Sequence, residues 1–283
     1  MRTHSDDSQT GLALQAIWRP WTRLGRFCRN QYAELVAAVL FLTILPLPGR
    51  RLLASSKDGS AGPIVGSVYY PLVGLILGAI LCLCAALFTA HVPALVLAAL
   101  LVLVGVTFTG GLHLDGVMDS CDGLFGGLGR ERRLEIMHDS RVGSFGVLGA
   151  STLLLLRFAI LASLPFWSLL AALLVAPILG RWAMVLAGGL FPAARPDGLG
   201  AAFHQAVTLR RLLLAGLSSV LMALLFAHLI GLFVWLLTNL LVLCLGIAVT
   251  RSLGGLTGDV CGALGEICEV CALLLFLLMH VSL

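Results

Sequence analysis

Residues 93–123, PALVLAALLVLVGVTFTGGLHLDGVMDSCDG, join an apolar run to an acidic segment. The first part, 93–112, contains no charged residue and has about the 20 residues that a helix needs to cross a bilayer. The acidic segment that follows, 113–123, holds three of the fourteen Asp and Glu residues in a chain of 283. The sequence therefore predicts a membrane helix that ends at a cluster of negative charge.

The composition extends this prediction to the whole chain. Hydrophobic residues make up 59% of the sequence and charged residues only 11%, and the mean hydropathy of +1.03 lies far above that of soluble domains. Apolar runs of spanning length recur at 64–89, 143–164, 167–190, 211–228, 232–250 and 263–281. We therefore predict an all-α, polytopic helical membrane protein with about seven transmembrane helices.

The N-terminal region is less regular. Residues 1–31 are polar and basic, and we expect them to form a mobile cytoplasmic arm before a single integral membrane catalytic domain, 32–283. The apolar segment 32–47 is short, and basic residues flank it on both sides. A span would carry one basic cluster across the membrane, so a re-entrant or interfacial helix is favoured over a span.

The positive charges predict the orientation of the bundle. The connections 90–92, 165–166 and 229–231 contain no Lys or Arg. The connections at the opposite end carry Arg130, Arg132, Arg133, Arg141, Arg195, Arg210, Arg211 and Arg251. Cytoplasmic loops are enriched in these residues, so the acidic segment is expected at the cytoplasmic mouth of the bundle. The net charge of +4 follows from this pattern, and no basic stripe with interleaved aromatic residues predicts a nucleic-acid partner.

Asp115, Asp119 and Asp122 are spaced at i, i+4 and i+7, which places them on one face of a helix. Three like charges repel one another unless a cation neutralises them. A solvated acidic helix end is the alternative, but ionisable residues at a membrane bundle favour a functional site. Carboxylate oxygens suit a hard cation, above all Mg²⁺, which commonly also binds substrate phosphates.

A second polar block, around Asp139 and Arg141, would complete such a site from the next helix. Asp139 would add a carboxylate, and the guanidinium of Arg141 matches phosphate oxygens. Gly116 and Gly123 would let the backbone and a ligand approach closely. Together these residues indicate metal-assisted phosphoryl transfer at the membrane face.

Other polar residues have two interpretations each. His113 would ligate metal or contact a phosphate, or form a hydrogen bond at a helix end. Arg157 and Arg181 would face substrate phosphates in a cavity, or pair internally with carboxylates. Asp259 and Glu266, at i and i+7, share a face of the last span and would act as ligands or as hydrogen-bond partners of substrate.

The motif GGLxxD occurs twice, at 110–115 and 254–259. Coincidence is an adequate explanation of the repeat. Both copies nevertheless lie at the same predicted end of a span, and each would place an Asp at the same membrane depth.

Residues 110–124, GGLHLDGVMDSCDGL, and 133–146, RLEIMHDSRVGSFG, resemble the two signature blocks of the cobalamin synthase family, also called adenosylcobinamide-GDP ribazoletransferase. His138 departs from the Lys or Arg common there, and Leu256 from a frequent Gln. The resemblance implies an inner-membrane, Mg²⁺-dependent enzyme that joins adenosylcobinamide-GDP to α-ribazole or its 5′-phosphate and releases GMP.

The resemblance also implies roles for the polar residues. Asp115, Asp119 and Asp122 would hold Mg²⁺ with Asp139, and one of them would instead take the proton of the attacking hydroxyl. Arg141 would steady the phosphates.

Two alternative functions remain open: a membrane phosphotransferase of the CDP-alcohol type, and a cation transporter. The transporter would need acidic residues near the bilayer midplane. The sequence does not decide whether the protein forms a homo-oligomer.

Overall fold

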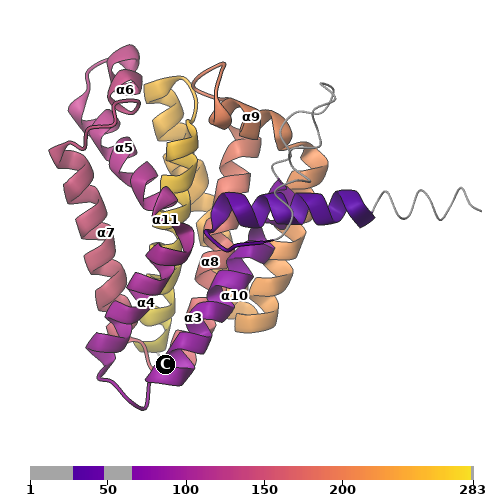
Figure 1. Cartoon of the computed structure of the whole chain (residues 1–283), viewed down its shortest axis with the longest axis vertical. Helices are drawn as coiled ribbons and strands as arrows, with labels where there is room; N and C mark the ends of the chain where they lie inside the picture. Colours follow the sequence, from indigo (N-terminus) through magenta and orange to yellow (C-terminus); the bar gives the residue numbers. More distant parts are fainter. Residues whose placement is uncertain (1–27, 48–65, 282–283) are drawn as a thin grey trace, which may run out of the picture.

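The computed structural model describes residues 28–47 and 66–281, and nearly all of them lie in helices (Figure 1). In this part of the chain, the only β-type pairing is an isolated bridge between Ala193 and Leu256. The all-α prediction is therefore confirmed. After a helix at 28–42, the elements are η1 (Ser67–Tyr69), α3 (Tyr70–Phe88), α4 (Ala94–Thr109), α5 (Leu112–Gly126), α6 (Arg130–Ile136), α7 (Ser144–Ser163), α8 (Phe166–Leu190), α9 (Leu199–Ala206), α10 (Leu209–Leu253) and α11 (Gly258–Val281).

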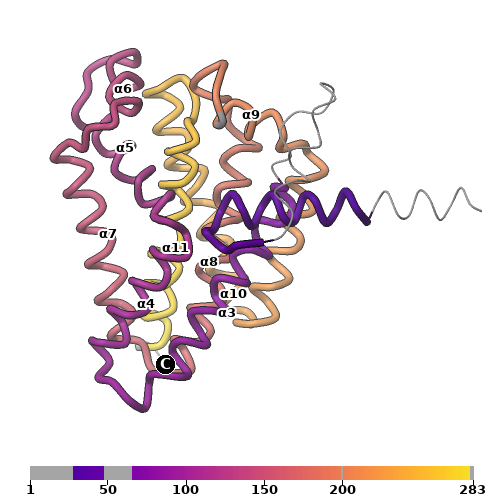
Figure 2. The backbone as a smooth tube through the Cα atoms, viewed as in Figure 1, coloured from indigo at the N-terminus to yellow at the C-terminus, as the bar shows by residue number. Residues whose placement is uncertain are grey.

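Five helices of the described residues are long and apolar enough to cross a membrane: α3 with η1, α7, α8, α10 and α11. A sixth crossing forms if α4 and α5, which meet at 90°, are one broken span. The change of direction between these two helices is visible in the backbone tube (Figure 2). The prediction of a polytopic helical membrane protein is thus confirmed.

Helix α10 contributes two crossings, because it reverses direction at His228. This residue has φ 51° and ψ −135°, which is not helical. Nε1 of Trp235 donates a hydrogen bond of 2.9 Å to Oγ of Ser219, 16 positions earlier. In a straight helix those residues would lie about 24 Å apart, at about 1.5 Å per residue. The two halves on either side of His228 match the predicted spans 211–228 and 232–250.

Helix α8 forms the centre of the bundle. In its most apolar window 83% of the residues are buried, compared with 28% for α7 and 22% for α10, which present leucines to the surrounding lipid. A Cβ on Gly74 or Gly78 of α3 would lie 2.4 or 2.6 Å from carbonyl oxygens of α8. These small residues therefore let α3 approach α8 closely, as small-xxx-small spacings do in membranes.

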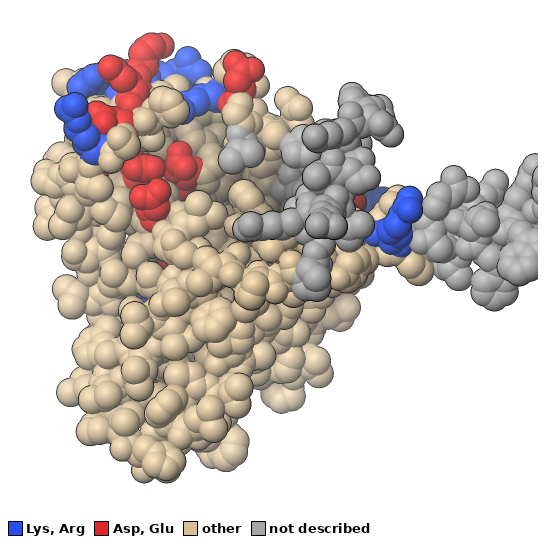
Figure 3. Space-filling view, viewed as in Figure 1, with Lys and Arg blue, Asp and Glu red and all other residues tan. Residues whose placement is uncertain are grey.

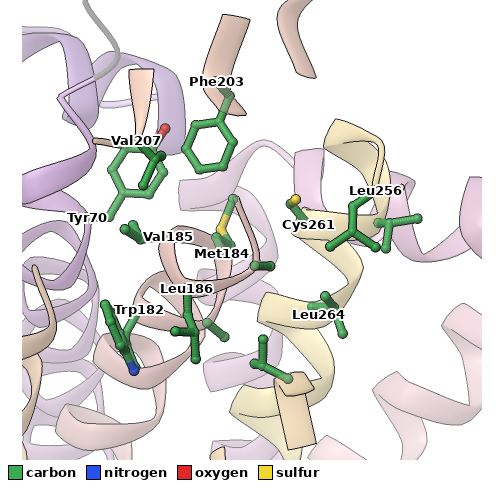
Figure 4. Packing of buried hydrophobic residues seen from close by; sticks show 14 of the residues in the cluster. Tyr70, Trp182, Met184, Val185, Leu186, Phe203, Val207, Leu256, Cys261 and Leu264 are labelled. Atoms are coloured by element: carbon green, nitrogen blue, oxygen red, sulfur yellow. The ribbon is translucent and has the colours of Figure 1, made fainter. Parts of the chain in front are cut away.

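The core continues to the polar end of the bundle, where α3, α8, α9 and α11 meet (Figure 4). The rings of Tyr70 and Phe203 stack there, with centroids 5.7 Å apart. Met184 and Cys261 are buried beside them. This packing fixes α9 against the start of α11, next to the site described below.

Helix 28–42 lies across the other helices rather than along them (Figure 1). Val39 and Leu42 pack into the core beside α3, and Glu34 pairs with Arg211 at 2.6 Å. This arrangement agrees with the interfacial or re-entrant helix favoured for 32–47. Residues 28–31, which we had placed in the mobile arm, already belong to the helix, and residues 1–27 lie outside the described part of the chain.

The polar connections are tied together at one end of the bundle. Nε of Arg130 donates to the carbonyl of Leu253 at 2.8 Å, and its Nη2 to that of Ala194 at 2.9 Å. Arg195 donates in turn to the carbonyl of Leu134. Figure 3 shows the charged side chains of this face gathered at the same end. The prediction that these loops share one side is confirmed, and the assignment of that side to the cytoplasm stays a prediction.

Candidate functional site

The acidic segment forms α5, which starts inside the bundle. Gly110 and Gly111 both have positive φ, 62° and 71°, a conformation that residues with a side chain rarely adopt. These two residues end α4 and turn the chain by 90° into α5. As a result α5 packs against α7 and α11.

Asp115, Asp119 and Asp259 form what we call the acidic face. Asp115 is exposed and Asp119 half-buried, and Asp119 interacts electrostatically with both Asp115 and Asp259. The ion pairs between described residues include none of the three. The nearest cation acting on Asp259 is the Arg195 guanidinium. The face therefore carries a net negative charge.

The two GGLxxD copies build this face. Asp115 lies in the first turn of α5 and Asp259 in the first turn of α11. A Cβ on Gly116 would lie 2.7 Å from the backbone oxygen of Asp259, so only glycine allows the two helices to approach this closely. The two copies bring Asp115 and Asp259 close enough to interact electrostatically, and the expectation of a shared membrane depth stays a prediction. The role predicted for Gly116 is wrong, because its hydrogen faces a helix instead of a ligand.

Asp122 caps the start of α7. Its Oδ2 accepts a hydrogen bond from the Gly143 N–H at 2.7 Å, and its Oδ1 one from the Gly146 N–H at 2.8 Å. A carboxylate at a helix N-terminus satisfies free N–H groups and the positive end of the helix dipole. Asp122 is only 7% exposed. Its predicted role as a metal ligand stays a prediction, and both oxygens already carry one hydrogen bond.

The glycines around Asp122 are required by this cap and by α6. A Cβ on Gly143 or Gly146 would lie 2.4 Å from an oxygen of Asp122. A Cβ on Gly123 would lie 2.9 Å from the carbonyl oxygen of Arg133. The prediction that Gly123 admits a ligand is therefore wrong, because α6 occupies that space.

We expect Gly146→Ala to lower the thermal unfolding midpoint of the protein in detergent, because the new methyl group displaces the Asp122 carboxylate. Loss of an N-cap costs about 0.5–2 kcal/mol of the free energy of unfolding. The matched control is Gly126→Ala, whose Cβ meets Phe145 at an ordinary 3.6 Å. An unchanged midpoint in Gly146→Ala, or an equal loss in both variants, would contradict the cap.

Asp139 and Arg141 lie on the exposed loop that leads from α6 to the Asp122 cap. Oδ1 of Asp139 accepts a hydrogen bond from the backbone N–H of Arg141 at 3.0 Å, which shapes the turn. The ion pairs of the described residues do not include Arg141. Arg141 is exposed, so an anion can reach its guanidinium.

Arg157 and Arg181 are buried in an ionic network with two carboxylates of α11. Arg157 pairs with Glu266 and Glu269, each at 2.8 Å, and Arg181 pairs with Glu269. All four side chains are less than 10% exposed. Of the two interpretations of these arginines, the structure supports internal pairing. Their predicted contact with substrate stays a prediction.

Glu269 is the residue of this network that the sequence analysis missed. It lies one helical turn after Glu266 on α11. Two arginines inside apolar spans require two carboxylates at similar depth. The sequence shows both arginines, so the need for a second carboxylate beside Glu266 could have been predicted from it. Nδ1 of His113 lies 4.0 Å from Oε1 of Glu266, which connects the network to the start of α5.

A cavity of about 330 Å³ opens beside the acidic face. It lies between helix 28–42, the start of α5, α9 and the start of α11. Asp259 belongs both to its lining and to the acidic face. A molecule in the cavity would therefore reach Asp259, which interacts with the carboxylates of α5.

The acidic face offers carboxylate oxygens, the kind of donor that binds a divalent cation. Within 28–47 and 66–281, no three His, Cys, Asp or Glu side chains lie close enough to form a metal-binding group. Mg²⁺ typically uses one or two carboxylates and completes its shell with water and phosphate oxygens. Carboxylate oxygens that form no ion pair among the described residues match that mode of binding better than an all-protein metal centre.

The fold and the site define a polytopic membrane protein whose polar site lies at the end of the bundle that carries its charged loops. The model of the cobalamin-5-phosphate synthase family matches residues 34–277 of the sequence. The chain belongs to this family, whose members are transferases of cobalamin biosynthesis.

Three relatives illustrate the similarity, and each is named adenosylcobinamide-GDP ribazoletransferase. The protein of Desulfitobacterium hafniense is 44% identical over 250 residues, which covers 87% of this chain and 95% of the relative. That of Desulforamulus reducens is 41% identical, with 87% and 97% covered. That of a Roseiflexus species is 38% identical, with 95% and 94% covered. No solved structure shows a significant match to the chain.

Proposed function

We propose that this protein joins adenosylcobinamide-GDP to α-ribazole, or to α-ribazole 5′-phosphate, and releases GMP. The names of the relatives support the identity of the substrates. The observation that carries the proposal is the acidic face, where Asp115, Asp119 and Asp259 converge without a paired cation. A diphosphate with a divalent cation is the ligand that such a face accommodates.

In the proposed reaction, a ribose hydroxyl of α-ribazole attacks the phosphorus next to the corrinoid. A new P–O bond forms, the P–O–P bond of the diphosphate breaks, and GMP leaves with the electron pair. The hydroxyl proton passes to a carboxylate of the acidic face, as in general base catalysis. Holding both substrates in line on one rigid surface supplies the rest of the acceleration.

Mg²⁺, when bound, would neutralise the charge that develops on the diphosphate and on the departing GMP. Asp115 and Asp119 are its proposed protein ligands, with Asp122 and Asp139 completing the predicted set. The exposed guanidinium of Arg141 would bind a phosphate from the loop side. The site would open to the cytoplasm from the bacterial inner membrane, in agreement with the arginines at that end of the bundle.

The substrate pair is tested with purified full-length protein in lipid nanodiscs with Mg²⁺. We expect GMP release with adenosylcobinamide-GDP and α-ribazole together, and none when either is omitted or when EDTA replaces Mg²⁺. A parallel arm supplies a CDP-alcohol and a second alcohol. Turnover only in that arm, or no GMP from the first pair, would contradict the proposal.

A further inference from the structure

The cavity beside the acidic face has an apolar floor and a polar rim. Met184, Phe203, Leu256 and Cys261 form the floor, and each is at most 6% exposed (Figure 4). The charged residues of the rim are exposed or half-buried and come from the loops, as Arg195 and Asp197 do. A ligand that enters would bury an apolar part and keep a polar part near the mouth.

One polar atom at the inner end of this cavity has no partner. His113 lines the cavity and is 3% exposed, and among the described residues its Nε2 makes no hydrogen bond. A buried polar atom without a hydrogen-bond partner is unfavourable. Its unused hydrogen-bonding capacity, next to an apolar floor, indicates a ligand with a single complementary polar atom at its buried end.

We propose that this cavity is the subsite for the acceptor nucleoside, an inference that rests on the proposed function. α-Ribazole is a benzimidazole riboside, so its base is flat, largely apolar and has one unsubstituted ring nitrogen. In the tautomer with the proton on Nε2, His113 donates a hydrogen bond to that nitrogen. The sugar then lies toward Asp259, on the acidic face, where the diphosphate is attacked.

The size and the apolar floor of the cavity favour the nucleoside over adenosylcobinamide-GDP. A cavity of about 330 Å³ is near the lower end of ligand pockets, which span about 300–1,000 Å³, so it accepts a nucleoside but not a corrinoid. The guanine of the GDP moiety carries several polar atoms along one edge. Burying these atoms against the apolar floor would leave most of them without hydrogen-bond partners, which is unfavourable.

The test is Ala201→Leu, which fills the cavity from α9, where Ala201 is 6% exposed and lines the wall. We expect the KM for α-ribazole to rise at least tenfold, about 1.4 kcal/mol, while the KM for adenosylcobinamide-GDP stays within twofold. The matched control is Ala202→Leu, one position on, which does not line the cavity. It is expected to leave both constants unchanged.

Direct binding separates this inference from the proposed function. The binding of α-ribazole alone and of GMP alone to the full-length protein is measured by equilibrium dialysis. We expect Ala201→Leu to bind α-ribazole more weakly than the wild type and to bind GMP with unchanged affinity. His113→Leu gives a second variant with the same expected result, should the first fail to fold. Unchanged α-ribazole binding, or weakened GMP binding instead, would overturn the subsite. Absence of GMP release from the wild type would overturn the proposed function.

Discussion

Asp119→Asn is expected to lower the rate of GMP release by at least about 100-fold, the lower bound of what a positioned general base contributes. Asp119 interacts electrostatically with both Asp115 and Asp259, the other two residues of the acidic face. The amide keeps the size of the side chain but removes the charge that holds a cation or takes a proton. The measurement is kcat at saturating concentrations of both substrates.

The matched control for this variant is Glu135→Gln. Glu135 is an exposed acidic residue of α6 that pairs with Arg132 at 2.7 Å on the surface. Exposed pairs of this kind contribute about 0–1 kcal/mol, so this variant is expected to keep wild-type activity and stability. A rate for Asp119→Asn within about threefold of this control would remove the acidic face from the mechanism, since a positioned general base contributes far more.

Glu269→Gln is expected to cause the largest loss of stability in the described part of the chain. Glu269 is the partner of both Arg157 and Arg181 inside the bundle, and the amide leaves positive charge there without compensation. Removing one partner of a buried ion pair costs about 3–5 kcal/mol. The measurement is the thermal unfolding midpoint in detergent.

The double variant Arg181→Met with Glu269→Leu separates pairing from substrate binding. It removes one charge of each sign and leaves Arg157 paired with Glu266 at 2.8 Å. Replacing a buried ion pair by apolar residues is often neutral for stability, so we expect the unfolding midpoint to recover. Activity is expected to recover with it. A stable double variant without activity would show that Arg181 contacts the substrate.

The spans could be predicted from the sequence because each depends only on a local run of apolar residues. The reversal within α10 was predicted as well, since the run is interrupted near His228. The orientation of α5 was not predicted, although Gly110 and Gly111 mark the turn before it. An angle of 90° between two helices is set by their packing against α7 and α11, which no local pattern encodes.

The sequence predicted which residues belong to the candidate site better than it predicted how they are arranged. The spacing of Asp115 and Asp119 was sufficient to place them on one helical face, and the repeated motif brought Asp259 to the same depth. The cap formed by Asp122 could not be predicted, because its partners, Gly143 and Gly146, lie more than 20 positions away. Long-range contacts of this kind decide whether a carboxylate stays free for a ligand.

The most direct test of the proposed reaction follows the phosphorus atom. Adenosylcobinamide-GDP with radiolabelled phosphorus next to the corrinoid is mixed with excess wild-type protein, α-ribazole and Mg²⁺ for a single turnover. We predict that all of the label appears in the cobamide product and that unlabelled GMP is released in equal amount. Label released as phosphate or in GDP, or no turnover at all, would contradict attack on that phosphorus at the acidic face.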